Sequence, residues 1–236
     1  MNTGERELED AAAPVKRTIK SYVVRAGRMT GGQQEAYDTL FPVYGLNQDD
    51  GVLDQQRVFG RVAPLVFEIG FGMGQSLIDM AKAAPDLNFI GVEVHPPGIG
   101  NLLRGIYDEK LQNLRVYRGD ARDILARCIA DQSLTTLQIF FPDPWHKKRH
   151  NKRRLIQPEF IASIAPKLCS GGHLHLATDW EEYAIQMMEV MSAAQGFANA
   201  NGSGRYATDH NRPETKFERR GQRLGHGVWD LVFSRL

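Results

Sequence analysis

The chain has 236 residues, a hydrophobic content of 42% and a charged content of 24%, values that are typical of a soluble globular protein with one full core. Its formal net charge is +1, so affinity for a polyanion must come from a local patch and not from the whole molecule. Nothing approaches the roughly 20 apolar residues of a membrane-spanning helix, and no apolar signal region opens the chain. We therefore expect a cytoplasmic protein that does not bind a membrane.

The first 28 residues predict a flexible arm, followed by a single domain over residues 29–236. Residues 1–13 are charged and alanine-rich, which is typical of disorder, whereas residues 16–28 are basic and contain Tyr22. The basic part is compatible with a solvated arm and equally with an arm that contacts RNA. Cys128 and Cys169 stand apart, outside any C-x-x-C pair or His/Cys cluster, so we expect buried thiols and no metal site.

From residue 62 onward, apolar runs alternate with segments of helical spacing, and we assign no element to residues 29–61. The expected strands cover residues 62–69, 88–94, 114–117, 137–141 and 173–178, and the expected helices cover residues 75–84, 97–109, 121–130, 155–168 and 181–194. Such alternation predicts an α/β fold with a mostly parallel sheet that helices cover on both faces. Two further strands, at 205–208 and 228–233, predict an antiparallel pair at the C-terminal edge of the sheet.

A glycine-rich turn, Glu68-Ile-Gly-Phe-Gly-Met-Gly74, lies between the first strand and the first helix. Glycines allow positive φ and a close approach of a ligand to the backbone. A dinucleotide site would need a small residue where Gln75 stands, and Glu68 would repel a pyrophosphate. An acid instead attracts an ammonium group, such as that of S-adenosylmethionine (SAM). A purely structural turn with Glu68 in solvent is the alternative.

Further acids follow the next two strands. Glu93 ends the second strand, at a position where acids bind ribose hydroxyls. Asp120 follows the third strand and either contacts an adenine amino group or caps the next helix. Asp123 fits the first turn of that helix. These positions favour a nucleoside cofactor without selecting one.

The most informative segment, residues 140–154, joins an acid to a dense basic run. Pro142 and Pro144 fix the backbone on both sides of Asp143, which predicts a preorganised carboxylate. Trp145 either stacks on a base or caps the core. Six Lys/Arg residues lie between positions 147 and 154, and cations of this density indicate contacts with phosphates. The segment therefore predicts an enzyme that acts on nucleic acid, against the alternatives of a structural loop and a solvated helix start.

Two later segments place polar groups near the same sheet edge. Asp179 follows the fifth strand in Thr-Asp-Trp and either lies in the site, caps the next helix, or does both. Residues 212–220, Arg-Pro-Glu-Thr-Lys-Phe-Glu-Arg-Arg, gather alternating charges in a loop that is able to bind a base or a backbone. Alone, this loop is uninformative.

Together these segments resemble the bacterial tRNA (guanine-N7)-methyltransferase family, from about Ser21 to the C-terminus. The most specific motifs are Phe-Pro-Asp-Pro-Trp with the basic run, Ala-Thr-Asp-Trp at 177–180 and Arg-Pro-x-Thr-Lys-Phe-Glu at 212–218. The glycine turn is similar to that of methyltransferases in general. The resemblance implies a Rossmann-like methyltransferase fold, SAM as cofactor, tRNA as partner and methyl transfer to N7 of a guanine in the tRNA variable loop. It leaves open whether the enzyme is a monomer or a homodimer.

The resemblance also implies roles for single residues, and none departs from the family pattern. Asp143 would be catalytic. The implied cofactor-binding residues are Glu68, Gly70, Gly72, Gly74, Glu93, Asp120 and Asp143. The implied substrate-binding residues are Lys147, Asp179, Thr215, Lys216, Phe217 and Glu218. The implied RNA-binding residues are Arg149, His150, Asn151, Lys152, Arg153 and Arg154.

Three other functions compete with this interpretation. A methyltransferase for another RNA fits the same residues, whereas one for a small molecule leaves the basic run without use. A nicotinamide-dependent oxidoreductase is disfavoured by Glu68 and Gln75. A non-catalytic RNA-binding module would leave Asp143 and the acids of the glycine turn without purpose.

Overall fold

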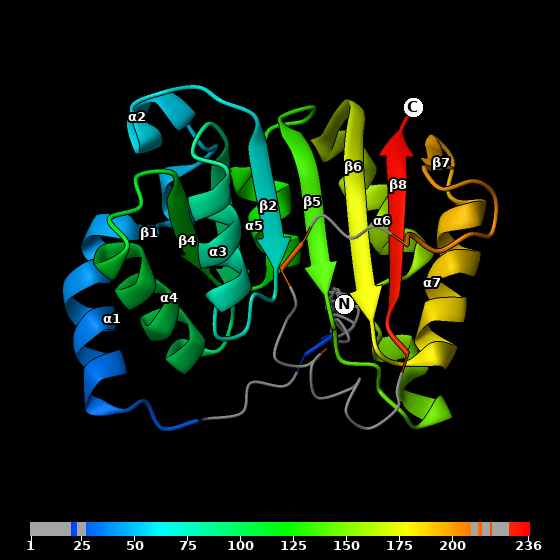
Figure 1. The fold of residues 1–236 in the computed structure, drawn as a ribbon, viewed down its shortest axis with the longest axis horizontal. Coiled ribbons are helices and arrows are strands. Elements are labelled where there is room, and N and C mark those ends of the chain that lie inside the picture. Colours follow the sequence, from blue (N-terminus) through cyan, green and yellow to red (C-terminus); the bar gives the residue numbers. More distant parts are fainter. Residues whose placement is uncertain (1–19, 23–26, 209–211, 214–217, 219–226) are drawn as a thin grey trace, which may run out of the picture.

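The computed structural model describes residues 20–22, 27–208, 212–213, 218 and 227–236. Within these residues the strands form one sheet in the order β1-β4-β3-β2-β5-β6-β8-β7. Pairing is parallel from β1 through β6, whereas β8 pairs antiparallel with both β6 and β7. The predicted fold class, a mostly parallel sheet with a C-terminal antiparallel edge pair, is confirmed (Figure 1).

The strands are β1 (Gly45–Leu46), β2 (Leu65–Ile69), β3 (Asn88–Glu93), β4 (Leu114–Arg118), β5 (Leu134–Phe140), β6 (Leu168–Thr178), β7 (Phe197–Asn199) and β8 (Trp229–Arg235). The α-helices are α1 (Gly31–Tyr44), α2 (Gln55–Phe59), α3 (Gln75–Ala83), α4 (Pro96–Asp108), α5 (Ala121–Cys128), α6 (Pro158–Ile164) and α7 (Glu181–Ala193). The 3-10 helices are η1 (Gln48–Asp50), η2 (Lys148–Arg153) and η3 (Ala165–Lys167).

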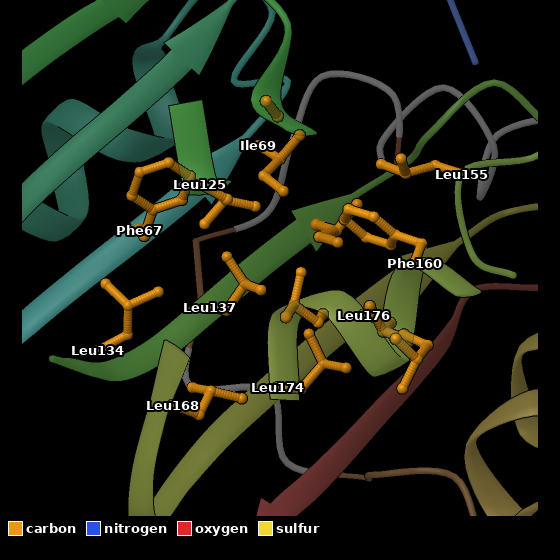
Figure 2. Packing of buried hydrophobic residues seen from close by; sticks show 14 of the residues in the cluster. Phe67, Ile69, Leu125, Leu134, Leu137, Leu155, Phe160, Leu168, Leu174 and Leu176 are labelled. Carbon is orange, nitrogen blue, oxygen red and sulfur yellow. The ribbon is translucent and has the colours of Figure 1, made fainter. Parts of the chain in front are cut away.

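Two apolar clusters bury the two faces of the sheet. On one face, side chains from β2, β5 and β6 pack against α5, α6 and α7, and Figure 2 shows Phe67, Leu137 and Phe160 in this cluster. On the other face, Val66 and Phe89 pack against α3 and α4. Each buried side chain of this size contributes roughly 1.5–3 kcal/mol. The sheet is thus a rigid support whose strand ends carry the polar residues.

Several predicted boundaries differ from the structure. Residues 205–208 form no strand, because only Ala207 bridges to Asp230, and the edge pair of β8 is instead β7. The helix predicted from residue 155 begins at Pro158, since proline suits a first helical turn, and ends at Ile164 before η3. Strand β6 begins at Leu168 and not at residue 173, since Leu168 already pairs with Leu134 of β5.

The carboxyl ends of β2, β5 and β6 lie on the same edge of the sheet, at the bottom of Figure 1. Ligands bind outside this edge in open α/β sheets. In the part of the chain that the structure describes, no helix is long and apolar enough to cross a bilayer. No group of three metal-binding side chains is assembled there either.

Candidate active site

The turn between β2 and α3 requires its glycines. Gly70, Gly72 and Gly74 have φ values of 76°, 59° and 81°, which L-residues with side chains rarely adopt. A Cβ atom on Gly74 would lie 2.8 Å from the side chain of Leu102. The turn therefore brings bare backbone to the sheet edge, as the sequence predicts.

Helix α4 packs closely against this turn through Gly98. A Cβ atom at this position would lie 2.0 Å from the carbonyl oxygen of Gly72, which is backbone and cannot rotate away. We expect Gly98→Ala to destabilise the protein by about 1–3 kcal/mol, because the helix or the turn must shift. Thermal unfolding tests this, with Gly31→Ala as control, since the added methyl group there meets no atom of the described residues within 4 Å. An unchanged melting temperature for Gly98→Ala would show that the turn accommodates the added methyl group without a loss of stability.

Glu93, at the end of β3, is held by three backbone amides. Its Oε2 accepts a hydrogen bond from the amide of Gly72 at 3.0 Å, and its Oε1 accepts from Val94 and His95 at 2.6 and 3.1 Å. These three bonds fix the orientation of the carboxyl group. Oε1 accepts two of these bonds and Oε2 accepts one, so Oε2 keeps a lone pair for a hydroxyl donor.

Glu68, the penultimate residue of β2, is a buried acid, and among the residues that the structure describes its Oε2 has no hydrogen-bond partner. Glu68 is 3% exposed, so the alternative of a structural turn with Glu68 in solvent is wrong. Burial raises the pKa of Glu68 to about 8, the charge of Glu93 adds to the rise, and Arg212 opposes it. At neutral pH this carboxyl is therefore mostly uncharged, and a buried unsatisfied group of this kind favours a cationic donor beside it.

A cavity of about 200 Å³ opens at the ends of β2, β3, β4 and β5. Its wall includes the predicted residues Gly70, Glu93, Asp120 and Asp143. Asp120 is also the N-cap of α5, because its carboxylate accepts the amide of Arg122 at 3.0 Å, so both of its predicted roles are compatible. Four residues from the ends of four strands, β2, β3, β4 and β5, thus meet at one cavity.

The predicted N-terminal arm contributes Ser21 and Tyr22 to the same wall. The carbonyl oxygen of Ser21 accepts a hydrogen bond from the indole Nε1 of Trp145 at 3.1 Å. The rest of the arm, residues 1–19 and 23–26, lies outside the described residues. The sequence carries no signal for this contact, because 124 positions separate its two residues.

The loop that carries Asp143 has unusual backbone geometry. Phe141 and Trp145 have φ values of 50° and 47°, although neither is glycine. Residues in this region cost about 1–3 kcal/mol and cluster at functional sites. The Oδ1 atom of Asp143 accepts the amide of Trp145 at 3.0 Å, which fixes the exposed carboxylate at the mouth of the cavity.

The basic run forms the 3-10 helix η2 beside this loop. Lys147, Lys148, Arg149 and Lys152 are exposed, as phosphate contacts require. Arg153 is half-buried and its guanidinium lies 4.7 Å from the Trp145 ring centre, whereas His150 packs edge-on against the same ring at 5.8 Å. The Trp145 ring is therefore held by basic neighbours on the surface and does not cap the apolar core.

The structure does not support the prediction that Arg154 binds RNA, because Arg154 is only 2% exposed. Its Nε donates to the carbonyl oxygen of Pro144 at 2.8 Å and its Nη1 to the Oε1 of Gln186 at 2.5 Å. The guanidinium also lies 4.8 Å from the ring centre of Tyr183. Arg154 thus supports the Asp143 loop from inside the protein, where a phosphate cannot reach it.

Asp179 directly follows β6 and is half-buried, on the sheet edge where it was predicted. The N-cap of α7 is Trp180, so the prediction that Asp179 caps this helix is wrong. The amide of Trp180 donates to Thr178 Oγ1 at 3.2 Å, and the Trp180 ring packs against His146 at 4.3 Å between ring centres.

Of the predicted substrate-binding residues in the late loop, Thr215, Lys216 and Phe217 lie outside the described residues. Glu218 is buried and ion-paired with Arg212, which also binds Asp230. No sequence motif predicts a role for Asp230 or for its neighbour His175. An acid within the apolar run at 229–233, in strand β8, indicates a buried partner, because burying a lone charge is costly.

Comparison with known proteins agrees with this geometry. A family model described as a putative methyltransferase matches residues 62–231. A tRNA (guanine-N(7)-)-methyltransferase of Saccharophagus degradans is 58% identical over 221 residues, which cover 93% of this chain and 96% of that protein. An enzyme of the same name from Pseudomonas aeruginosa strain UCBPP-PA14 is 58% identical over 234 residues, which cover 99% of this chain and 96% of that protein.

Solved structures share the fold at low sequence identity. The 16S rRNA methyltransferase KamB aligns with a TM-score of 0.58 at 16% identity, over 78% of this chain and 94% of that one. The aminoglycoside resistance methyltransferase NpmB1 aligns with a TM-score of 0.53 at 16% identity, over 81% and 94% of the two chains. These likenesses concern the fold alone. The identity to the curated relatives over nearly the whole chain goes further, and this chain belongs to the tRNA (guanine-N7)-methyltransferase family.

Proposed function

We propose that the protein transfers a methyl group from SAM to N7 of a guanine in the variable loop of tRNA. The observation that supports this most strongly is the position of Asp143, whose carboxylate lies at the mouth of the acid-lined cavity and next to the exposed part of the basic run. Cofactor chemistry and polyanion binding thereby meet at one sheet edge. A tRNA substrate is compatible with the cytoplasmic location predicted from the sequence.

The residues around the cavity fit SAM. Glu68 does not line the cavity itself but precedes the lining residue Ile69, and it is a buried acid whose Oε2 has no hydrogen-bond partner within the described part of the chain, which suits a positively charged group. Glu93 and Asp120 line the cavity with oxygens that accept hydrogen bonds from hydroxyl and amino groups. Gly70 and Gly72 remove side chains where the ligand must approach the backbone. When bound, SAM supplies an electrophilic methyl group on a sulfonium sulfur.

The protein has little proton chemistry to perform in this reaction. Guanine N7 carries a free lone pair, so no general base is needed to create the nucleophile. The main contributions are orientation of the base and electrostatic stabilisation of the positive charge that develops on it. Asp143 supplies a fixed carboxylate for that charge, and Lys147, Asp179 and residues 215–218 would hold the guanine.

The exposed part of η2 would contact tRNA phosphates, and the salt dependence of binding tests this. We expect replacement of Lys148 and Arg149 by Ala to reduce the slope of log Kd against log salt by about 1–2, because each phosphate contact releases counterions. The control replaces Arg57 and Lys82 by Ala. Their side chains are 60% and 59% exposed, and neither residue lines the cavity. An unchanged slope for the η2 variant would remove this segment from the RNA interface.

The proposed function is tested by incubating the protein with labelled SAM and an unmodified tRNA transcript. Labelled tRNA is then cleaved by chemistry specific for N7-methylguanine. We expect cleavage at a single variable-loop guanine. Label without that cleavage would indicate a SAM-dependent RNA methyltransferase that acts on a different atom. Label in another RNA and not in tRNA would support the alternative that the enzyme methylates that RNA. No label in any RNA would contradict the proposal.

A further inference from the structure

Two chain segments leave the sheet side by side at the carboxyl ends of β5 and β6 (Figure 1). The amide of Phe141 donates to the carbonyl oxygen of Ala177 at 2.8 Å, which continues the pairing of the two strands. Asp143 and Asp179 each lie two positions beyond this bond, one in each segment. The two segments thus carry an acid at matching positions along the edge of the sheet.

The same two segments meet again through a pair of aromatic rings. His146 and Trp180 pack edge-on, with 4.3 Å between ring centres and 70° between ring planes. His146 directly precedes Lys147, and Trp180 directly follows Asp179. Each ring is therefore next in sequence to a residue that we expect to hold the guanine.

Trp180 is the anchored member of this ring pair. It is half-buried, packs against the apolar cluster formed by β2, β5 and β6, and its amide donates to Thr178 Oγ1 at 3.2 Å. His146 is exposed, and its imidazole makes no hydrogen bond or ion pair with the described residues. Trp180 thus supports an exposed aromatic ring at the edge of the sheet.

The neighbouring ring of Trp145 is held differently. It is half-buried, its Nε1 donates to the carbonyl oxygen of Ser21 at 3.1 Å, and its ring contacts Arg153 at 4.7 Å and His150 at 5.8 Å. These contacts fix Trp145 among protein groups. Of the two adjacent rings that follow Asp143, His146 is therefore the exposed one.

We infer that His146, supported by Trp180, stacks on the target guanine when that base is out of its own stack. This inference rests on the proposed function. In an RNA helix N7 lies in a deep and narrow groove that side chains do not enter, so enzymes that modify bases take them out of the stack. An unstacked base is stabilised by stacking on an aromatic side chain. His146 supplies such a ring between Asp143 and Lys147 in the chain.

The ring should affect the rate more than the affinity for tRNA. Phosphate contacts of η2 hold tRNA whether or not the guanine is unstacked, whereas an aromatic ring binds only the unstacked base. Loss of the ring lowers the fraction of bound tRNA whose guanine is in place, and the transfer rate falls with that fraction.

His146→Leu and His146→Phe test the inference, because leucine removes the aromatic ring and phenylalanine keeps one. The matched control is His173→Leu. His173 is also an exposed histidine, contacts Ser234 Oγ at 3.2 Å, and lies within β6 away from the cavity beside Asp143. For each variant we would measure the melting temperature, the Kd for SAM, the Kd for tRNA, and the single-turnover rate of methyl transfer with saturating tRNA and SAM.

We expect the single-turnover rate of His146→Leu to fall about 10–100-fold, which corresponds to the loss of one stacked base. Both Kd values should stay within about threefold of wild type, and His146→Phe should keep the rate within the same factor, because stacking needs an aromatic face and not the imidazole nitrogens. A rate for His146→Leu no lower than that of His173→Leu, or a rate for His146→Phe as low as that of His146→Leu, would overturn the inference and leave the proposed function intact. Absence of methyl transfer by the wild-type protein would overturn both.

Discussion

Replacement of Asp143 by Asn is expected to lower the single-turnover rate of methyl transfer about 10²–10³-fold, while the Kd for tRNA stays within about threefold. The carboxylate stabilises positive charge that develops on the guanine only as the new bond forms, so its loss affects the transition state more than the bound substrate. Asn keeps the Oδ1 atom that accepts the amide of Trp145, so the loop retains its geometry and only the charge is removed.

The control for this experiment is Asp131→Asn, which removes an exposed acid that pairs with Lys167 away from the cavity. Its transfer rate should match that of the wild type. Rapid-quench kinetics with labelled SAM gives the rate, and filter binding gives the Kd. Equal losses of rate and of tRNA affinity in Asp143→Asn would assign Asp143 to RNA binding and not to the transition state.

The second large effect is expected for Glu68→Gln, which should weaken SAM binding about 100-fold, because removing one partner of a buried charge pair costs several kcal/mol. In the wild type, the affinity should rise up to tenfold per pH unit until about pH 8, since the raised pKa of Glu68 means that a proton must leave before the carboxylate can pair with a cation. Calorimetric titrations between pH 6 and 9 measure both effects. A wild-type affinity that does not change with pH would contradict this role of Glu68.

The same substitution should make the folded protein more stable at pH 8. The folded state holds a proton on Glu68 up to about pH 8, whereas the unfolded chain releases it near the ordinary value of 4.5. Folding stability therefore falls between these two pH values, by up to about 1.4 kcal/mol per pH unit, and is constant above them. Glu68→Gln removes this loss, so its chemical denaturation midpoint at pH 8 should exceed that of the wild type. A midpoint below that of the wild type would show that Glu68 is ionised and satisfied in the folded protein.

The central sheet is predictable because its strands are buried on both faces and read as continuous apolar runs. The helices and strand before residue 62 are not predictable in this way, because they do not form continuous apolar runs. Helix α1 buries only Ala36 and contains Pro42, and β1 is two residues long. Helix α1 is held mainly by packing against α4, a contact that local sequence does not encode.

The acids of the site are predictable for a topological reason, since residues that follow parallel strands share one edge of the sheet. Glu93, Asp120 and Asp143 meet there at the cavity. The basic run shows the limit of this reasoning. Its cations look equivalent in sequence, yet Arg154 turns inward because Gln186, 32 positions later, supplies a half-buried acceptor.

The cluster around Arg212 is unpredictable for the same reason. Asp230 lies 18 positions from Arg212 and 55 positions from His175, and only the antiparallel addition of β8 brings the three side chains together. The sequence shows that Asp230 interrupts an apolar strand, which indicates a buried partner, but it does not identify that partner.

The most direct test of the account is methyl transfer to a tRNA in which the variable-loop target guanine is replaced by 7-deazaguanine. This analogue keeps the Watson–Crick edge and the shape of guanine but has carbon in place of N7. We predict that the substituted tRNA binds with the Kd of the unmodified transcript, receives no methyl group, and competitively inhibits transfer to the unmodified transcript. Methyl transfer at an undiminished rate would show that N7 of this guanine is not the acceptor and would contradict the proposed function.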